Sequence, residues 1–510
     1  MPVLKPVQNW TIVPEVQPGR PALQKVLLIG QKLSGGSASD GLVENIGNDN
    51  SWDTLFGKTS QLAGLCREFR KINQVTQLDA ICISDNGSGV QGTAVHTITG
   101  TATENGTLYF TVASEKNHRY IVDVLSGDTA DDVGTALETA IAADTEAPFT
   151  SANSSGVVTH TAENAGTLCN DWSIKVEGSV AGIAVALTGW TGGATDPVLT
   201  TLLDPIANIR YQTIVWPNTN WAEGDLTDLL DARFNIEYKI MDGVAITTKV
   251  GTAAECVSYA DQNSQSYVVF GNKSVSRTEL KGAAIAERSD VISTHFAAIR
   301  TLRFTEDAIL TRYQTTTSAN DQFGGPHQRS LPYFNTLMPL LPIAEEKDEF
   351  TLIEMNETLE DSGVSVISSN RTYNGVILGG IVTTYLNNPA GNPDTSFKFL
   401  NTVDTESYIR EYYYESFRSQ KGQNRLTDGA VANGYSIDNE GTLRAFCLGL
   451  YQDCADIQLT RAGKVAEKDY LQNLVITLDL STGKVTIAQA PLLVSQLRSV
   501  IGSIQINLSN

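Results

Sequence analysis

The first strong pattern in the chain is a short apolar run that ends in a glycine-rich bend, "VLLIGQKLSGGSAS". An apolar run bounded by turn residues predicts a buried strand, here at residues 26–30. Residues 59–72 then place Leu, Cys, Phe and Ile at helical spacing, and a second apolar run, "LDAICIS", occupies residues 78–84. A strand, a helix and a strand in this order predict a βαβ unit, which requires a parallel sheet.

The pattern changes between residues 94 and 196, where Thr, Ser, Ala and Gly dominate. The segments "GTLYFTVAS", "RYIVDVLSG", "GVVTHTAEN" and "DWSIKVEG" predict short strands separated by turns. One helix is predicted, in "TADDVGTALETAIAAD", with Thr129 as its N-cap and acidic residues in its first turn. This stretch is therefore expected to form a β-rich domain.

The α/β pattern resumes after this stretch. Strands are predicted at residues 211–217 and in "GVAITTKV" and "SYVVFG", and helices at residues 224–236 and 279–300. A further helix, in "MNETLEDSGVSVI", is expected to end at Gly363. Because α/β patterns flank it on both sides, the β-rich stretch is interpreted as an insertion into one core domain.

The two ends of the chain read as extended segments. Residues 1–24 contain five prolines, which disfavour a helix, yet "NWTIVPEV" also carries apolar side chains that need a partner surface. Near the other end, "NLVITLDL" and "KVTIAQA" predict a hairpin, and "GSIQINLSN" predicts a last strand with no partner left in the sequence. Both ends are therefore expected to pair with neighbouring subunits, through Trp10, Ile12 and Val13 at the first end and Ile504, Ile506 and Leu508 at the second.

The predicted fold class is α/β (mixed α+β) and multidomain. The expected parts are an extended N-terminal arm (1–24), an α/β core (25–93 and 197–385), an inserted β-rich outward domain (94–196), a C-terminal α+β domain (386–500) and a C-terminal strand arm (501–510).

Charge limits the possible partners. The formal net charge is −21 with a pI near 4.7, which excludes direct binding of nucleic acid or of anionic membrane through clustered Lys and Arg. Residues 94–196 alone hold 13 acidic and 3 basic residues, whereas residues 398–510 hold 12 acidic and 11 basic residues. The C-terminal region is therefore expected to contact a partner, with Lys464, Lys468, Lys484 and Arg498 as candidate contact residues.

The sequence lacks the patterns of three kinds of chemical site. Gly30 and Gly35 have the spacing of a phosphate-binding loop, but Gly36 stands where that loop needs lysine. The five histidines lie in no catalytic-triad setting, and His327 in "FGGPHQRS" is interpreted as a loop residue. The six cysteines form no C-x-x-C pair, so we expect no disulfide framework and no metal site. Together with the loop and the histidines, this predicts no cofactor and no catalytic residue.

Targeting segments are also not expected. The start, "MPVLKPVQNW", lacks the apolar region of a signal peptide, and no apolar run approaches the length of a membrane span.

Five stretches in order resemble the contractile-tail sheath proteins of myophages, in particular the Mu-like branch. They are "RPALQKVLLIGQKLSGGSA", "LLDPIANIRYQTIVWPNTN", "PYFNTLMPLLPIAEEKDEFTLIEMNETLEDSGVSVI", "VILGGIVTTYLNNPAGNPDTSF" and "LLVSQLRSVIGSIQINL". The loop "GPHQRSLPYF", which contains His327, departs from the family pattern.

The resemblance implies a structural role and no enzymatic activity. Family members assemble with themselves as stacked six-membered rings around a tail tube protein, with baseplate and tail terminator or neck proteins at the ends. Arms add strands to neighbours' sheets, and contraction drives the tube through the host envelope for genome ejection. The expected location is the virion tail, with assembly in the host cytoplasm.

Two alternatives remain open at the level of the sequence. One is the sheath of a phage-tail-like bacteriocin or secretion system, and the other is a hydrolase-shaped enzyme.

Overall fold

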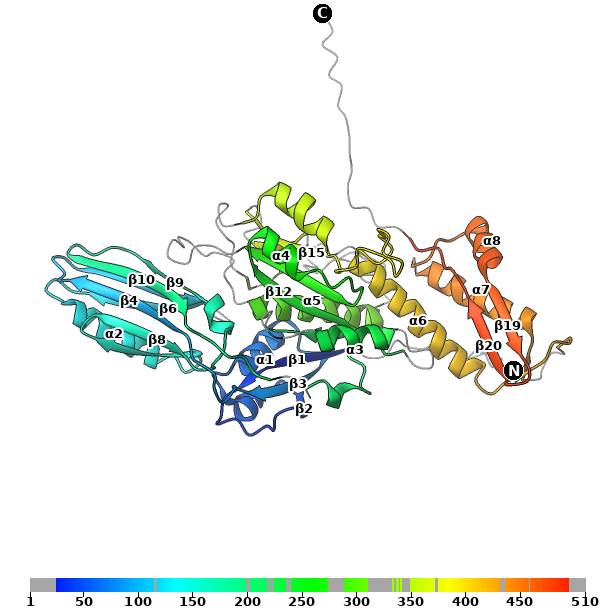
Figure 1. Ribbon diagram of the computed structural model, residues 1–510, viewed down its shortest axis with the longest axis horizontal. Helices are drawn as coiled ribbons and strands as arrows, with labels where there is room; N and C mark the ends of the chain where they lie inside the picture. Colours follow the sequence, from blue (N-terminus) through cyan, green and yellow to red (C-terminus); the bar gives the residue numbers. More distant parts are fainter. Residues whose placement is uncertain are drawn as a thin grey trace, which may run out of the picture. The chain divides into compact units, whose positions relative to one another are not determined.

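The structure is a computed structural model of the chain (Figure 1). It describes residues 24–113, 117–198, 202–217, 221, 224–234, 240–273, 289–310, 333, 336–338, 340–341, 349–371, 375–431, 436–457 and 459–494. The predicted arm contacts Trp10, Ile12, Val13, Ile504, Ile506 and Leu508, together with Arg498 and the His327 loop, lie outside the described residues.

Nine of the described strands form one sheet in the order β14-β16-β15-β13-β12-β11-β1-β3-β2. Their bounds are Lys25–Lys32 (β1), Val43–Ile46 (β2), Gln77–Ser84 (β3), Thr213–Val215 (β11), Val244–Gly251 (β12), Tyr267–Lys273 (β13), Leu337–Met338 (β14), Val364–Asn370 (β15) and Gly375–Leu378 (β16). The six strands from β15 to β3 are parallel to one another, and β14, β16 and β2 pair antiparallel. The mixed α/β fold class and the parallel pairing of β1 with β3 are thus confirmed.

Helices cover both faces of this sheet, so its strands are buried on two sides and read as continuous apolar runs. On one face lie α1 (Gln61–Ile72) and α5 (Ser289–Leu310), with Leu62, Phe69 and Phe296 in the shared apolar cluster. On the other face lie α3 (Gly224–Phe234), α4 (Ala253–Tyr259) and the short helix η5 (Glu354–Leu359).

The glycine-rich bend after β1 has a packing role. An ideal Cβ on Gly36 would lie 2.6 Å from the Leu55 carbonyl oxygen, in the short helix η1 (Asp53–Gly57), whereas a Cβ on Gly35 would meet nothing within 4 Å. The backbone of Ala38 also donates to the Leu55 carbonyl, at 2.9 Å. Gly36 therefore lets the bend lie directly on η1, which is why no lysine stands there.

The strands from β4 to β10 build two antiparallel sheets of their own, β10-β4-β8-β7 and β6-β5-β9. The elements are Thr93–Gly100 (β4), Gly106–Ala113 (β5), Asn117–Val124 (β6), Ala130–Ala142 (α2), Phe149–Ser154 (β7), Val157–Ala162 (β8), Ser173–Glu177 (β9) and Ile183–Thr191 (β10). We call this part, residues 93–191, the insert. Its apolar cluster contains residues of the insert alone. Figure 1 shows the insert in light blue to turquoise.

Histidines lie in the middle of the insert. His96 Nδ1 is 2.7 Å from His160 Nε2, and His160 Nδ1 is 2.6 Å from Ser151 Oγ. Phe149 packs edge-on against both His160 and His118. Burial lowers the pKa of His96 to about 3 and the pKa of His160 to about 4. Both rings are therefore neutral in the folded insert near pH 7.

The chain divides into two compact units, and the second begins at Tyr408, inside helix α6 (Leu400–Gln420). We call the described part of this second unit, residues 408–494, the C-terminal unit. Its other elements are Arg425–Leu426 (β17), Ile437–Asp438 (β18), Glu440–Asp456 (α7), Lys464–Asn473 (α8), Val475–Asp479 (β19) and Lys484–Ala488 (β20). Its core joins Ile409 and Tyr412 of α6 to Leu450 and Cys454 of α7.

Most sequence predictions of elements match the structure. Thr129 caps α2 in a reciprocal arrangement with Asp132, and Gly363 adopts the left-handed conformation, with φ of +80°, at the predicted helix end. The hairpin turn at residues 481–483 joins β19 to β20 as predicted.

Other predictions were wrong in part. The helix before Gly363 is a π-helical turn followed by a 3₁₀ turn (η6, Glu360–Ser362), and α5 runs to Leu310, past the predicted end. After β16, Val382 makes an isolated bridge to Phe399. The close approach of Gly379 to Val366 turns the chain away from the sheet at that point.

The bend after β1 gives a matched pair of substitutions. We expect Gly36→Ala to lower the free energy of unfolding by roughly 1–3 kcal/mol, because the new methyl group collides with backbone that cannot move aside easily. Gly35→Ala is the control and should change it by less than about 0.5 kcal/mol. Urea unfolding of both variants measures the difference, and equal stabilities would contradict the packing role of Gly36.

The lowered pKa values of His96 and His160 predict that the insert loses stability in acid. Unfolded histidine binds a proton near pH 6.5, whereas folded His96 and His160 resist protonation until about pH 3 and 4. The insert's free energy of unfolding should therefore be highest above pH 6.5 and fall as the pH drops towards 4, by up to about 1.4 kcal/mol per pH unit for each histidine.

Urea unfolding at several pH values, followed through the near-ultraviolet circular dichroism of the edge-to-face Trp172–Trp190 pair, measures this slope. The variant His96→Leu should have a shallower slope. The same slope in both proteins would show that other groups cause the acid sensitivity.

Candidate functional site

The carboxyl end of β1 is the place where an open α/β sheet commonly binds its ligand. Strands β3 and β11 lie on opposite sides of β1, so the order of strands reverses here, and the N-terminus of α1 begins nearby. Such a reversal opens a crevice at the ends of the strands. In this protein the loop that follows β8 of the insert, residues 163–167, contacts both elements.

Asn164 makes the central contacts of this loop. Its Oδ1 accepts a hydrogen bond from the Gln61 backbone N–H at 2.9 Å, so it satisfies a free donor at the start of α1. Its Nδ2 donates to the Lys32 carbonyl at 3.2 Å and to Asp85 Oδ1 at 2.9 Å. One side chain of the insert thus joins β1, α1 and the segment after β3.

Asp85 accepts several hydrogen bonds between the core and the loop of the insert. Its carboxylate accepts from Gln31 Nε2 at 2.8 Å and from the Ala165 backbone N–H at 2.8 Å, in addition to Asn164. Gln31 is fully buried and also donates to the Ala165 carbonyl at 2.6 Å. A buried amide needs such partners because water cannot reach it.

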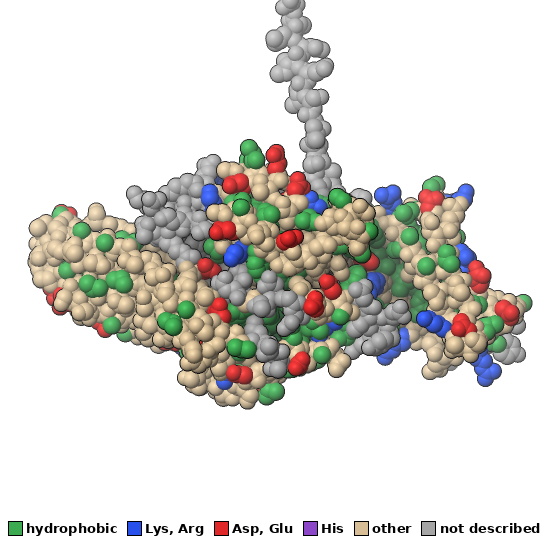
Figure 2. Space-filling view, viewed as in Figure 1, with side chains coloured by type: hydrophobic (Ala, Val, Ile, Leu, Met, Phe, Trp, Pro, Cys, Tyr) green, Lys and Arg blue, Asp and Glu red, His purple; other side chains and the backbone are tan. Residues whose placement is uncertain are grey.

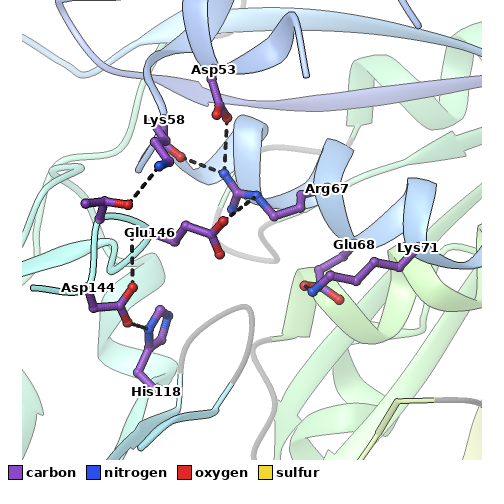
Figure 3. A network of polar contacts seen from close by, with 9 residues as sticks. Asp53, Lys58, Arg67, Glu68, Lys71, His118, Asp144 and Glu146 are labelled. Atoms are coloured by element: carbon purple, nitrogen blue, oxygen red, sulfur yellow. Dashed lines mark hydrogen bonds and ion pairs between the residues drawn. The ribbon is translucent and has the colours of Figure 1, made fainter. Parts of the chain in front are cut away.

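A second group of contacts joins the insert to η1 and α1 (Figure 3). Lys58 Nζ donates to Thr145 Oγ1 at 2.8 Å. Arg67 points from α1 towards Asp53 Oδ1 at 3.2 Å and towards Glu146 Oε1 at 3.9 Å (Figure 3). Thr59 also donates to Glu163. We call the contacts of residues 144–146 and 163–167 with the core the junction.

The junction leaves no place for a phosphate at the end of β1. An ideal Cβ on Gly30 would lie 3.2 Å from Leu62 Cβ, so β1 and α1 are in close contact. The Gln61 N–H, which a phosphate would need, already donates to Asn164. The chemistry of this place is therefore structural: polar groups of the core and of the insert satisfy one another.

Buried polar pairs also hold α5 against α1. Gln61 Nε2 donates to Asp290 at 2.8 Å, and His295 Nε2 lies 3.1 Å from Glu68. Burial alone would raise the pKa of Glu68, but the hydrogen bond and charge of His295, together with Lys71, leave it lowered. Removing either member of such a buried pair leaves the other side chain buried without a partner for its charge or its hydrogen bond.

Buried hydrogen bonds also hold the start of α6 against α5. Arg300 of α5, which is buried, donates to Asp404 and to the Gln212 carbonyl. Tyr333 donates to the second oxygen of Asp404 at 2.7 Å.

The described histidines lie in two different parts of the structure. His96, His118 and His160 lie inside the insert, and His295 forms the pair with Glu68 on α5. His118 contacts Asp144 at 2.6 Å, beside the junction (Figure 3). Within the described ranges, no group of three His, Cys, Asp or Glu side chains is arranged to hold a metal ion. All six cysteines are buried thiols.

The C-terminal unit holds the predicted contact lysines that the structure describes. Lys464 and Lys468 are exposed on α8, and Val465 between them is 76% exposed. Lys484 is exposed on β20, opposite Asp479 of β19. Lys and Arg side chains are frequent over this unit in Figure 2, whereas the insert shows little blue on the same face.

The hairpin β19–β20 is the second feature of this unit. It pairs with no other described strand, so the outer backbone groups of both strands are free of sheet partners there. Its inner face places Ile476 and Ile487 against the cluster of Tyr451 and Tyr470. Val475, on the outer face, is 56% exposed.

Sequence reasoning found the hairpin and the lysines but missed the junction. Its members are Asn, Gln, Thr, Asp, Glu, Lys and Arg residues far apart in the chain, and none of them forms a motif. The signal that was available is weak: "AENAG" follows a strand, and its asparagine stands where a turn also prefers asparagine.

No described helix has both the length and the apolar character to cross a membrane.

Comparison with known proteins gives a relative that spans almost the whole chain. No family model matches. The tail sheath protein of the Mu-like prophage FluMu from Haemophilus influenzae is 28% identical over 498 residues, which cover 95% of this chain and 93% of the relative.

Solved structures of low identity are also similar. The sheath tail protein of Desulfitobacterium hafniense is 11% identical, covers 92% of this chain and 97% of its own, and has a TM-score of 0.46. The sheath tail protein of Listeria innocua is 11% identical, covers 93% of each chain and has a TM-score of 0.47.

The match to this relative extends through the core, the insert and the C-terminal unit. Along nearly its whole length, this chain is therefore similar to a Mu-like tail sheath protein.

Proposed function

We propose that this protein assembles with itself into stacked six-membered rings around a tail tube, and that the resulting sheath contracts to drive the tube through the host envelope. The observation that carries the proposal is the match along 95% of the chain to a tail sheath protein. The working partners are the tail tube protein, the baseplate and the tail terminator or neck proteins. The sheath belongs to the virion tail and assembles in the host cytoplasm.

Terminal arms link the subunits in this proposal. Residues 5–17 and 502–508 pair as strands with a neighbour's sheet, through Trp10, Ile12 and Val13 and through Ile504, Ile506 and Leu508. The hairpin β19–β20 supports this view because a two-stranded sheet leaves both edges without partners in the part that the structure describes. A strand added to such an edge gains main-chain hydrogen bonds and covers apolar side chains such as Val475.

The C-terminal unit faces the tail tube in this proposal, and the insert faces outward. The region 398–510 is nearly neutral in a protein of net charge −21, so it repels a partner surface least. Lys464 and Lys468 present exposed cations beside an exposed valine on α8, and Lys484 and Arg498 are further candidates. Residues 94–196 hold 13 acidic and 3 basic residues. This excess of negative charge suits an outer surface, because it repels the surfaces of neighbouring particles.

The arms give the first test. We expect Ile506→Pro to abolish formation of tubes while the monomer stays folded, because proline removes a main-chain donor from the middle of the added strand. Ser509→Pro, beyond the proposed strand, is the matched control and should assemble normally. Sedimentation and circular dichroism measure assembly and folding, and normal tubes from Ile506→Pro would disprove the linking role of this arm.

The orientation gives the second test. Treatment of assembled tails with a lysine-reactive cross-linker should join Lys464 or Lys468 to the tube protein, since both side chains are exposed in the C-terminal unit. Mass spectrometry identifies the joined peptides. Loss of these products in the double variant Lys464→Gln/Lys468→Gln is the control, and tube cross-links from Lys175 of the insert alone would reverse the orientation.

A further inference from the structure

The junction between the insert and the core is built from polar contacts. The apolar cluster of the insert contains only residues between Ala94 and Trp190, and the clusters on the two faces of the core sheet contain no residue of that range. Among the described residues, the two bodies therefore bury separate cores. Interfaces held by polar groups alone are typical of domains that move relative to one another.

The contacts concentrate on few residues. Asn164 contributes three hydrogen bonds, and Asp85 accepts from Gln31, Asn164 and the Ala165 N–H. Asp196, on the segment that returns to the core, accepts from the Thr167 backbone N–H at 2.8 Å. Water supplies equivalent partners to all these groups once the bodies part, so the net cost of separation is small compared with that of opening an apolar core.

The two segments that cross between the bodies contain positions suited to a pivot. Val90 and Ala194 exchange backbone hydrogen bonds, so the outgoing and returning segments are paired on the insert side. On the core side of this pair, Gly87 has no heavy atom within 4 Å of an ideal Cβ, and Thr195 holds φ at +61°, in the left-handed region that non-glycine residues rarely adopt. Both segments can thus change direction without disturbing packed side chains.

We propose that the junction is a releasable lock, centred on Asn164 and Asp85, and that the insert turns as one body about Gly87 and Thr195 when the lock opens. The docked arrangement is the one described here. In the released arrangement, water takes the place of the loop at the carboxyl end of β1. This inference concerns the single subunit and holds or fails independently of how the subunits assemble.

Spin labels on the two bodies measure the lock in the full-length protein. All six native cysteines are buried, so labels can be placed at Val75→Cys, at a residue 65% exposed in the core, and at the exposed insert residue Thr188→Cys. Pulsed electron paramagnetic resonance reports the distribution of distances between them. The otherwise unchanged protein should give one narrow distribution.

Asn164→Ala is the test variant, because it removes three contacts of the lock at once. We expect a second or broadened distance population, with the ratio of released to docked protein raised roughly tenfold or more. Asp85→Asn, which keeps the size of the side chain but replaces one accepting oxygen with an N–H₂ donor, should shift the ratio in the same direction.

Asn153→Ala is the matched control. Asn153 also makes several side-chain hydrogen bonds, to Asp131, Thr135 and Gly156, but all of them lie within the insert. This variant should destabilise the insert and leave the distance distribution narrow. Folding of each variant is checked through the circular dichroism of the Trp172–Trp190 pair.

Two results would overturn the inference. A distribution that stays narrow in folded Asn164→Ala and Asp85→Asn would show that other contacts hold the insert. A distribution that is equally broad in the parent protein, Asn153→Ala and Asn164→Ala would show that no lock exists.

Discussion

The buried amide of Gln31 at the end of β1 is the constraint around which the two main bodies of this subunit are arranged. A buried N–H₂ group has to find hydrogen-bond acceptors inside the protein, and the Nε2 group of Gln31 finds them in Asp85 and in the Ala165 carbonyl of the insert. The insert therefore completes the polar end of the parallel sheet. The crevice that many α/β proteins use for a ligand is used here to hold a part of the same chain.

The second unit depends on a comparable constraint at α6. The first turns of this helix belong to the core, where Asp404 meets Arg300 and Tyr333, and its later turns supply Ile409, Tyr412 and Tyr413 to the C-terminal unit. One continuous helix thus takes part in two separate cores.

The sequence was informative wherever neighbours in the chain are also neighbours in space. The apolar runs of β1 and β3 predicted parallel pairing, Thr129 predicted the start of α2, and Gly363 predicted a helix end, since each depends on local hydrogen bonds or on one stretch of burial. Strands β4, β7 and β10 were missed because their Thr, Ser and Ala residues give little contrast between the two faces. The match to a tail sheath relative confirmed the class of protein that five short resemblances had indicated.

By itself, the sequence indicated a resemblance to tail sheath proteins through five short stretches. It also determined the mixed α/β class, the acidic net charge and the absence of a phosphate-binding lysine at Gly36, because these follow from composition and from local spacing. Only the tertiary structure decided that Gly36 is needed for contact with Leu55, that Asn164 caps α1, and that Asp85 joins the insert to β1. Asn164 and Gln61 are 103 residues apart, and the geometry of a hydrogen bond across such a separation is fixed by the folded chain alone.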